Sequence, residues 1–197
     1  KLQDLALCIS KDVHEIKKDY IRVIKGIEKF SREEIIVTNM NIRDIISILE
    51  IDTNEYIKTN SLDIKLICDL YTNFNVHENY YMMSVINNLI YNSIDALKNK
   101  KDGIIRLTIS ERDNSYIMAV SDNGMGIKKS NLDFIFNSGF STKFDSISGD
   151  IYRGVGLAIV KDLVEGLFQG TISVDSVENK ETTFTITFPV RVFVPIR

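Results

Sequence analysis

The sequence predicts a two-layer α/β sandwich that follows an N-terminal helical arm. Segments with the apolar spacing of a helix alternate along the chain with segments that have the spacing of a strand. The last strand places Phe184, Ile186 and Phe188 on one face and threonines on the other, so one face of its sheet is buried. Helices and strands that share one apolar sheet face are expected to pack as two layers.

The arm is predicted by its apolar spacing. From Leu2 to Phe30 the apolar residues recur at steps of three and four, which leaves one narrow seam along a helix. Such a seam needs a partner helix, so we expect residues 1–38 to form a dimerising arm that makes the chain a homodimer. Packing of the arm against its own domain is the alternative.

A break between arm and domain is expected near residues 31–40. Ser31 is followed three positions later by Glu34, a helix-start pattern, and the stretch 38–41 is polar. Residues 39–197 then form the second domain. Its expected elements are a helix over 42–58, a strand over 62–68, a helix over 78–99, strands over 104–110 and 116–121 joined by a turn at Asp113-Asn114, a helix from about Gly154, and a final pair of strands.

Composition narrows the function classes. The chain of 197 residues is 44% hydrophobic and 26% charged, which is ordinary for a globular protein. Its net charge of -3 leaves no basic excess for a phosphate backbone, so nucleic acid is not expected as a partner.

Cysteine usage and hydropathy predict the compartment. Cys8 and Cys68 have neither disulfide-framework nor metal-ligand spacing, which fits a reducing cytosol. No apolar run approaches the roughly 20 residues of a membrane span, and no leader pattern is seen. We therefore expect a cytoplasmic location, with membrane attachment only through segments upstream of Lys1.

Polar residues line one side of the helix predicted over 78–99. Asn88, Asn92 and Asp95 recur at helical spacing beside a core stripe that includes Ser93. Amide oxygens and a carboxylate on one helix face suit Mg²⁺ that also bridges nucleotide phosphates. Taken alone, the same stripe is equally consistent with a solvated helix face.

Two glycine-containing segments follow. Asp122 ends a predicted strand, and Gly124 and Gly126 behind it permit a tight turn and close approach of a ligand. Gly154 and Gly156 open a helix, where backbone N–H groups favour phosphate. Each segment alone is a common pattern.

In this order, the segments resemble the N, G1 and G2 boxes of the GHKL ATPase superfamily, which includes histidine kinases, Hsp90, DNA gyrase and MutL. The stretch 88–96 is similar to the N box of histidine kinases, and 136–143 is similar to their F box and lid. The resemblance covers about residues 40–190 and implies the Bergerat-type ATP-binding fold.

The resemblance implies roles for single residues. Asn92 would be the main Mg²⁺ ligand with Asn88 assisting, and Asp122 would recognise the adenine amine. Thr182 would help to hold the base, although Asn179 and Glu181 replace the glycines that usually precede it. The remaining residues expected around ATP are Asp95, Gly124, Gly126, Gly154, Gly156 and Leu157.

Two cations flank the expected lid. Lys143 and Arg153 are placed to neutralise the γ-phosphate during phosphoryl transfer. The alternative is that both side chains are ordinary solvated surface charges.

The phosphoacceptor is expected on the arm. His14 and Glu15 resemble the H box of histidine kinases, with His14 at the margin of the seam and Glu15 placed to orient or deprotonate it. The sequence of residues 14–20 is similar to that of a Gram-positive group of sensor kinases with glutamine-responsive members. Lys18-Asp19-Tyr20 stands where the family has Asn-Pro-Leu, and little chain follows Phe30 for a second long helix, so the arm is atypical or truncated.

The sequence thus predicts the ATP-dependent kinase core of a two-component sensor. It would phosphorylate itself on His14 and pass the phosphoryl group to an aspartate of a response regulator. Another GHKL enzyme, either an ATP-driven clamp or a serine kinase, is one alternative. A nucleotide-binding scaffold without phosphotransfer, motivated by the unusual H box, is the other.

Overall fold

The computed structural model describes residues 39–140 and 154–195. Contacts within the chain group residues 39–197 into one compact unit. The predicted arm with His14 and Glu15 lies outside the described residues, as do Lys143 and Arg153 of the expected lid.

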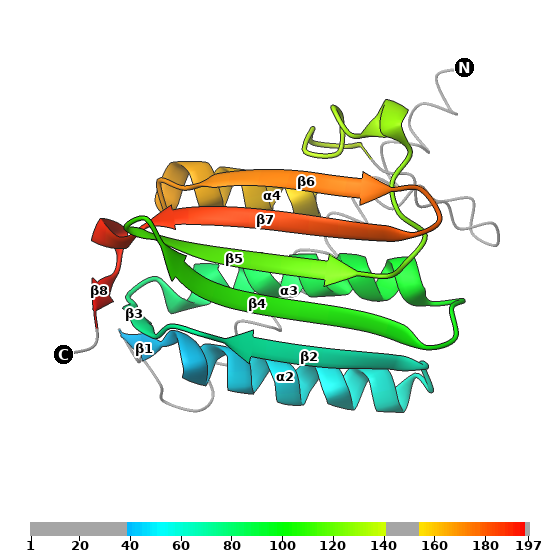
Figure 1. Ribbon diagram of the computed structural model, residues 1–197, viewed down its shortest axis with the longest axis horizontal. Coiled ribbons are helices and arrows are strands. Elements are labelled where there is room, and N and C mark those ends of the chain that lie inside the picture. The colour runs from blue at the N-terminus through cyan, green and yellow to red at the C-terminus, as the bar shows by residue number, and fades with distance from the viewer. Residues whose placement is uncertain (1–38, 141–153, 196–197) are drawn as a thin grey trace, which may run out of the picture. The chain divides into compact units, whose positions relative to one another are not determined.

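A five-stranded sheet forms one layer of the domain (Figure 1). Only the pair of β2 and β4 is parallel; the other neighbours in this sheet are antiparallel. Its strands, in spatial order, are β2 (Ile64–Leu70), β4 (Gly103–Arg112), β5 (Ser115–Asp122), β7 (Glu181–Pro189) and β6 (Thr171–Val177).

Three helices cover one face of this sheet, as Figure 1 shows. They are α2 (Ile42–Thr59), α3 (Asn79–Leu97) and α4 (Gly156–Asp162). A π-helical segment, Leu163–Leu167, continues α4. The predicted two-layer α/β sandwich is therefore confirmed, with its core between the helices and the inward side chains of β4, β5 and β7.

Local sequence explains most of these elements. Asn41 caps α2, because its Oδ1 accepts from the backbone N of Arg43 at 2.8 Å. Asp113 and Asn114 have φ values of 50° and 58°, which is the left-handed turn that joins two antiparallel strands most tightly. Phe184, Ile186 and Phe188 are all buried, as their alternation predicts.

Two elements start two residues later than predicted. The strand expected over 62–68 is β2, which begins at Ile64, because Leu62 still donates its backbone N–H to Ile57 at the end of α2. The helix expected from Gly154 begins at Gly156.

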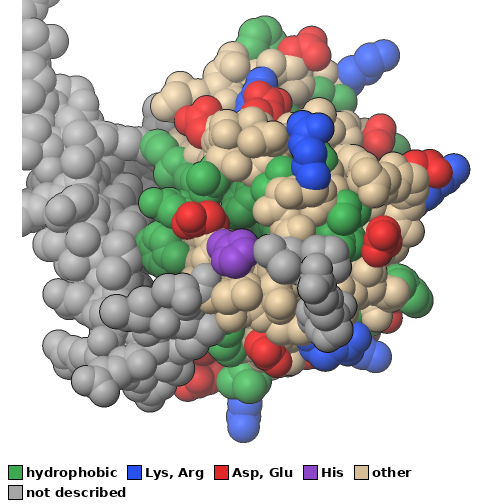
Figure 2. All heavy atoms as spheres, turned by 90° about the vertical axis from the view of Figure 1, so that its left-hand side faces the viewer, with side chains coloured by type: hydrophobic (Ala, Val, Ile, Leu, Met, Phe, Trp, Pro, Cys, Tyr) green, Lys and Arg blue, Asp and Glu red, His purple; other side chains and the backbone are tan. Residues whose placement is uncertain are grey.

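A second, three-stranded sheet was not predicted. It has the order β1 (Met40–Asn41), β3 (Phe74–Val76) and β8 (Val194–Pro195). Phe193, directly before β8, packs its ring 4.8 Å from the ring of Phe74. This end of the domain faces the viewer in Figure 2, where hydrophobic side chains lie among polar ones.

His77 lies ahead of α3 and is exposed, as expected for a surface residue at a helix start. Within residues 39–140 and 154–195, the helices lack the combination of length and apolar character that a bilayer crossing requires.

Candidate functional site

Asp122 is a buried carboxylate at the end of β5, with 5% of its surface exposed. Its Oδ1 accepts from the backbone N of Gly124 at 2.9 Å, and its Oδ2 accepts from the hydroxyl of Ser93 at 2.9 Å. Ser93 lies on α3, so the two hydrogen bonds hold the carboxylate between the helix layer and the loop that follows β5. The carboxylate of Asp122 is therefore a hydrogen-bond acceptor in a fixed position.

Burial raises the pKa of Asp122 above its ordinary value of 3.8, because water no longer solvates the charged form. The hydrogen bonds from Gly124 and Ser93 and the positive charge of Lys100 act in the opposite direction. The net shift of the pKa is upward, so the buried, ionised carboxylate lowers the free energy of unfolding.

Thr182 lies opposite Asp122 in the register of β7 and β5, and only 3% of its surface is exposed. Its Oγ1 is 3.0 Å from the hydroxyl of Ser176 on β6. The Ser176 Oγ also accepts from the backbone N of Ile127 at 2.8 Å. A hydroxyl cluster thus ties the loop after β5 to both neighbouring strands.

The glycines of this loop are required by close approach. A Cβ at Gly124 would lie 2.6 Å from Asp122 Oδ1 and 2.8 Å from Ala96 Cβ. Gly126 has a φ of +64°, and a side chain there would collide with the backbone of Val177. The loop can therefore run closely between α3 and β6 only without side chains at these two positions.

Asn88 on α3 meets the start of α4. Its Nδ2 donates to the backbone O of Ser84 at 2.8 Å, which directs its Oδ1 away from the helix backbone. A Cβ added to Gly156 would be 2.7 Å from that Oδ1. Asn92 and Asp95 follow on the same helix and are half-buried.

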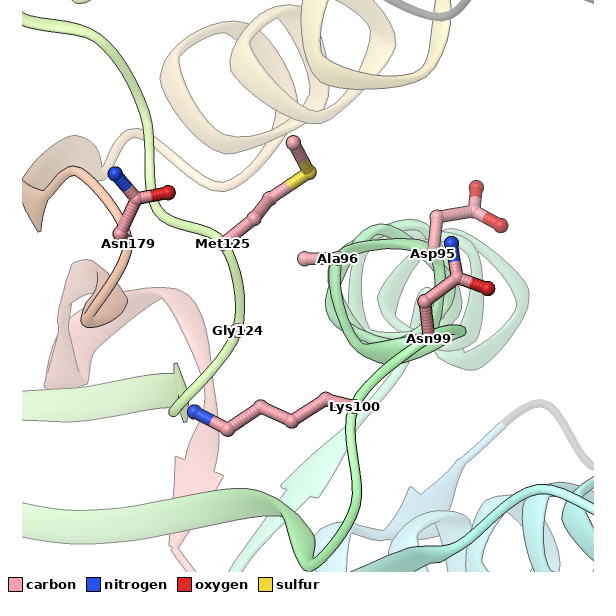
Figure 3. A pocket seen from close by; sticks show the side chains of 7 residues that line it. All are labelled: Asp95, Ala96, Asn99, Lys100, Gly124, Met125 and Asn179. Atoms are coloured by element: carbon pink, nitrogen blue, oxygen red, sulfur yellow. The ribbon is translucent and has the colours of Figure 1, made fainter.

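A hollow of about 350 Å³ opens beside Gly124 (Figure 3). In Figure 3, Lys100 extends toward the end of β5, and Met125 lies between the loop and α3. Lys100 Nζ donates to the backbone O of Asn123. The full lining is Asp95, Ala96, Asn99, Lys100, Gly124, Met125 and Asn179.

The predicted residues come together in two groups. Asp122, Gly124, Gly126 and Thr182 form the end of the sheet, and Asn88 with Gly156 forms the contact of α3 with α4. Gly154 accepts through its backbone O from the N of Gly139 at 3.2 Å. Leu157, also expected around ATP, is half-buried and packs against the core.

Residues 79–192 match the family described as histidine kinase-, DNA gyrase B- and HSP90-like ATPase. The chain belongs to this family. It is an ATPase family, so the fold built around Asp122 is an ATP-binding domain.

The family match extends to named relatives. The chain is 28% identical over 192 residues to the sensor histidine kinase GlnK of Bacillus subtilis, which covers 97% of the chain and 46% of the relative. It is 38% identical over 111 residues to the sensor histidine kinase ZraS of Escherichia coli, covering 56% of the chain and 22% of that protein. The chain therefore spans less than half the length of these relatives.

Solved structures share the fold of this ATPase domain. The catalytic domain of histidine kinase ThkA superposes with a TM-score of 0.62 at 21% identity, over 77% of this chain and 93% of the other. The mycobacterial sensor histidine kinase MprB gives a TM-score of 0.62 at 20% identity, over 80% of this chain and 98% of the other.

The donor set of the ATPase domain is compatible with Mg²⁺ held together with a nucleotide. The described residues form no group of three or more His, Cys, Asp or Glu side chains that would hold a metal without other ligands. Asn88 presents an amide oxygen at the contact with α4, and Mg²⁺ favours few protein oxygens plus phosphates and water.

Sequence reasoning missed three residues of the site. Ser93 was expected in the core stripe, but its hydroxyl donates to Asp122. The signal that could have identified it is a hydroxyl at an otherwise apolar position. Ser176 and Lys100 carried no local signal, because their contacts depend on the register of β6 and on the path of the loop after β5.

Proposed function

We propose that this chain is the kinase core of a two-component sensor, which binds Mg·ATP, phosphorylates His14 and then donates the phosphoryl group to a response-regulator aspartate. In this proposal residues 1–38 are the dimerising phosphoacceptor arm and residues 39–197 are the catalytic domain. The observation that carries the proposal is the buried Asp122, held by Ser93 and Gly124 in a domain of the ATPase family.

Binding of ATP would use both groups of the site. Asp122 accepts from the adenine amine, and Thr182 lies beside it. The loop glycines let the base approach the backbone of β5 and α3. The phosphates would extend toward Gly154 and Gly156, where the backbone N–H groups at the start of α4 are donors to anions.

Asn92 and Asn88 would hold Mg²⁺ with the phosphate oxygens. Mg²⁺ neutralises charge on the phosphates when it is bound. Lys143 and Arg153 are proposed to add positive charge near the γ-phosphate, and Asp95 would lie at the edge of the site.

The transfer step itself needs a neutral imidazole. A ring nitrogen of His14 attacks the γ-phosphorus with its lone pair, the bond to the β–γ bridging oxygen breaks, and ADP leaves with that electron pair. Glu15 is placed to accept the proton of the other ring nitrogen or to hold the ring in position. In the second transfer an aspartate oxygen of the regulator attacks the same phosphorus and His14 leaves.

The relatives support the proposed partners. One ThkA structure holds that kinase in complex with the response regulator TrrA, and it superposes on this chain with a TM-score of 0.61. We propose a receiver domain of this kind as the partner, a homodimer as the active state, and a cytoplasmic location for this part of the protein.

Autophosphorylation with radiolabelled Mg·ATP tests the proposed function. We expect acid-labile, base-stable label on the wild-type chain and none on His14→Gln. The control is ATP affinity of the variant, which should be unchanged because His14 is not in the ATPase domain. Label that survives acid would favour a serine kinase, and ATP binding without any label would favour a scaffold.

A further inference from the structure

Ser176 on β6 contacts Thr182 of the proposed adenine site, called the base pocket below, and has three polar neighbours around its single hydroxyl. Its Oγ accepts from the backbone N of Ile127 at 2.8 Å. It lies 2.8 Å from the backbone O of Glu181 and 3.0 Å from Oγ1 of Thr182. These contacts decide where two hydroxyl protons must lie.

The carbonyl of Glu181 fixes the proton of Ser176. A carbonyl oxygen has no proton to donate, so a 2.8 Å contact between it and a hydroxyl is attractive only if the hydroxyl donates. The backbone N–H of Ile127 is also a donor and takes one lone pair of Ser176. Ser176 therefore has no proton left for Thr182.

Thr182 must then donate to Ser176. The contact of 3.0 Å between the two hydroxyls is a hydrogen bond only if one of them supplies a proton, and only Thr182 can do so. Its remaining lone pairs are acceptors. Ser176 has accepted two hydrogen bonds and donated one, which satisfies the whole hydroxyl.

Asp122 adds further acceptors in the same place. It lies opposite Thr182 in the strand register, and each of its oxygens already accepts one internal donor, from Gly124 and Ser93. The lone pairs that remain on Asp122 and Thr182 accept only. Both residues are almost fully buried, so a water molecule does not readily enter to act as a donor in their place.

We propose that Ser176 is a specificity-determining positioning residue, which by holding the hydroxyl proton of Thr182 makes the base pocket accept a 6-amino purine and reject a 6-oxo purine. The inference rests on the proposed ATP site and adds what sets its selectivity. A 6-amino group brings donors to these acceptors, whereas a 6-oxo group brings an acceptor and leaves buried groups unpaired.

The competing role for Ser176 is that of a loop anchor, through Ile127. Loss of an anchor would weaken all purine nucleotides alike. If Ser176 instead fixes the hydroxyl proton of Thr182, its loss would change the ratio of the affinities for 6-amino and 6-oxo purines. Thr182 would then be able to rotate its hydroxyl and donate to a 6-oxo group. The ratio of two affinities therefore separates the two roles.

The experiment measures dissociation constants of ATP and inosine triphosphate, both with Mg²⁺, by calorimetry on the full chain. We expect the wild type to prefer ATP, and Ser176→Ala to reduce that preference by about tenfold, the value of one buried hydrogen bond. Ser176→Thr keeps a hydroxyl and should keep the wild-type ratio. The matched control is Ser173→Ala on the same strand, whose exposed hydroxyl makes only a 3.5 Å contact with the backbone O of Thr185.

Thr182→Val covers the case in which Ser176→Ala does not fold, which thermal melting will show. It removes the acceptor but leaves the anchor of Ile127, and should also reduce the preference for ATP. An unchanged ratio in the folded Ser176→Ala protein, or in Thr182→Val, overturns this inference alone. A wild-type chain that binds neither nucleotide overturns the proposed function and this inference with it.

Discussion

Gly156 at the start of α4 lies against Asn88 on α3, so closely that an added Cβ would be 2.7 Å from Asn88 Oδ1. This distance is below any normal contact of a methyl carbon with an oxygen. The two residues belong to separate glycine and asparagine patterns of the sequence. Their contact brings the proposed phosphate and metal groups of the site together.

Gly156→Ala should therefore displace the amide of Asn88 or push α4 outward. We expect ATP affinity in the presence of Mg²⁺ to fall by about tenfold or more, since the proposed ligands would lose their alignment. Titration with a fluorescent ATP analogue measures the change.

The control for this variant is Gly166→Ala. A Cβ at Gly166 has no neighbour within 4 Å, so the substitution should leave affinity unchanged and stabilise the helical segment by up to about 1 kcal/mol. Equal affinity in the Gly156 and Gly166 variants would mean that α4 does not align Asn88.

Asp122→Asn should separate stability from binding. The pKa of Asp122 is raised in the folded protein by burial, so the folded state holds this proton more tightly than the unfolded state. The free energy of unfolding therefore decreases as pH rises from the ordinary value of 3.8 through the raised value, and the penalty is complete above it. Asparagine carries no such penalty.

The variant also keeps both internal hydrogen bonds, because its amide oxygen accepts from Gly124 and its amide nitrogen donates to Ser93. At pH 7 we expect Asp122→Asn to be at least as stable as the wild type, while its ATP affinity falls tenfold or more. Urea denaturation at pH 4 to 8 measures the first part and calorimetry the second. A variant that is less stable at pH 7 than at pH 4, relative to wild type, contradicts the assigned pKa direction.

The sequence was sufficient for parts of the site that are determined locally. Asp122 and Gly126 could be predicted because a strand end and a positive φ impose residue types at the position itself. Ser176 could not, because its role arises from the register that places it opposite Thr182. In the sequence, a strand serine that bonds a neighbouring strand cannot be told from one that faces solvent.

The small sheet was unpredictable for a different reason. Strands β1 and β8 contain two residues each, too few for any alternation to be read. Both strands pair with β3, and the ring of Phe193 packs against that of Phe74, a contact between residues more than 100 positions apart that no local pattern marks.

Removal of the Asn92 side chain should abolish the effect of Mg²⁺ on nucleotide binding. If Asn92 holds Mg²⁺ with the phosphates, Asn92→Ala should bind ATP with the same affinity in Mg²⁺ as in EDTA, and that affinity should equal the value of the wild type in EDTA. Asn87→Ala is the matched control, an equally half-buried asparagine on the same helix outside the proposed ligand set. A persistent Mg²⁺ effect in Asn92→Ala would assign the metal to other residues.

Phe193 is predicted to link the two sheets energetically. Its side chain is 5% exposed and lies within aromatic contact of four rings, with centroids 4.8 to 5.9 Å apart. These rings belong to Phe74, Tyr116, Phe168 and Phe188. Phe193→Ala should lower the free energy of unfolding by about 3 to 5 kcal/mol, through lost apolar transfer and the cavity that remains.

Phe134→Ala provides the comparison, because Phe134 is 50% exposed and makes one looser ring contact, 6.2 Å from Phe140. Its removal should cost less than about 1 kcal/mol. Chemical denaturation of both variants gives the difference directly. A small loss in Phe193→Ala would mean that the three-stranded sheet opens without disturbing the main core, and that β8 contributes little to the stability of the ATPase domain.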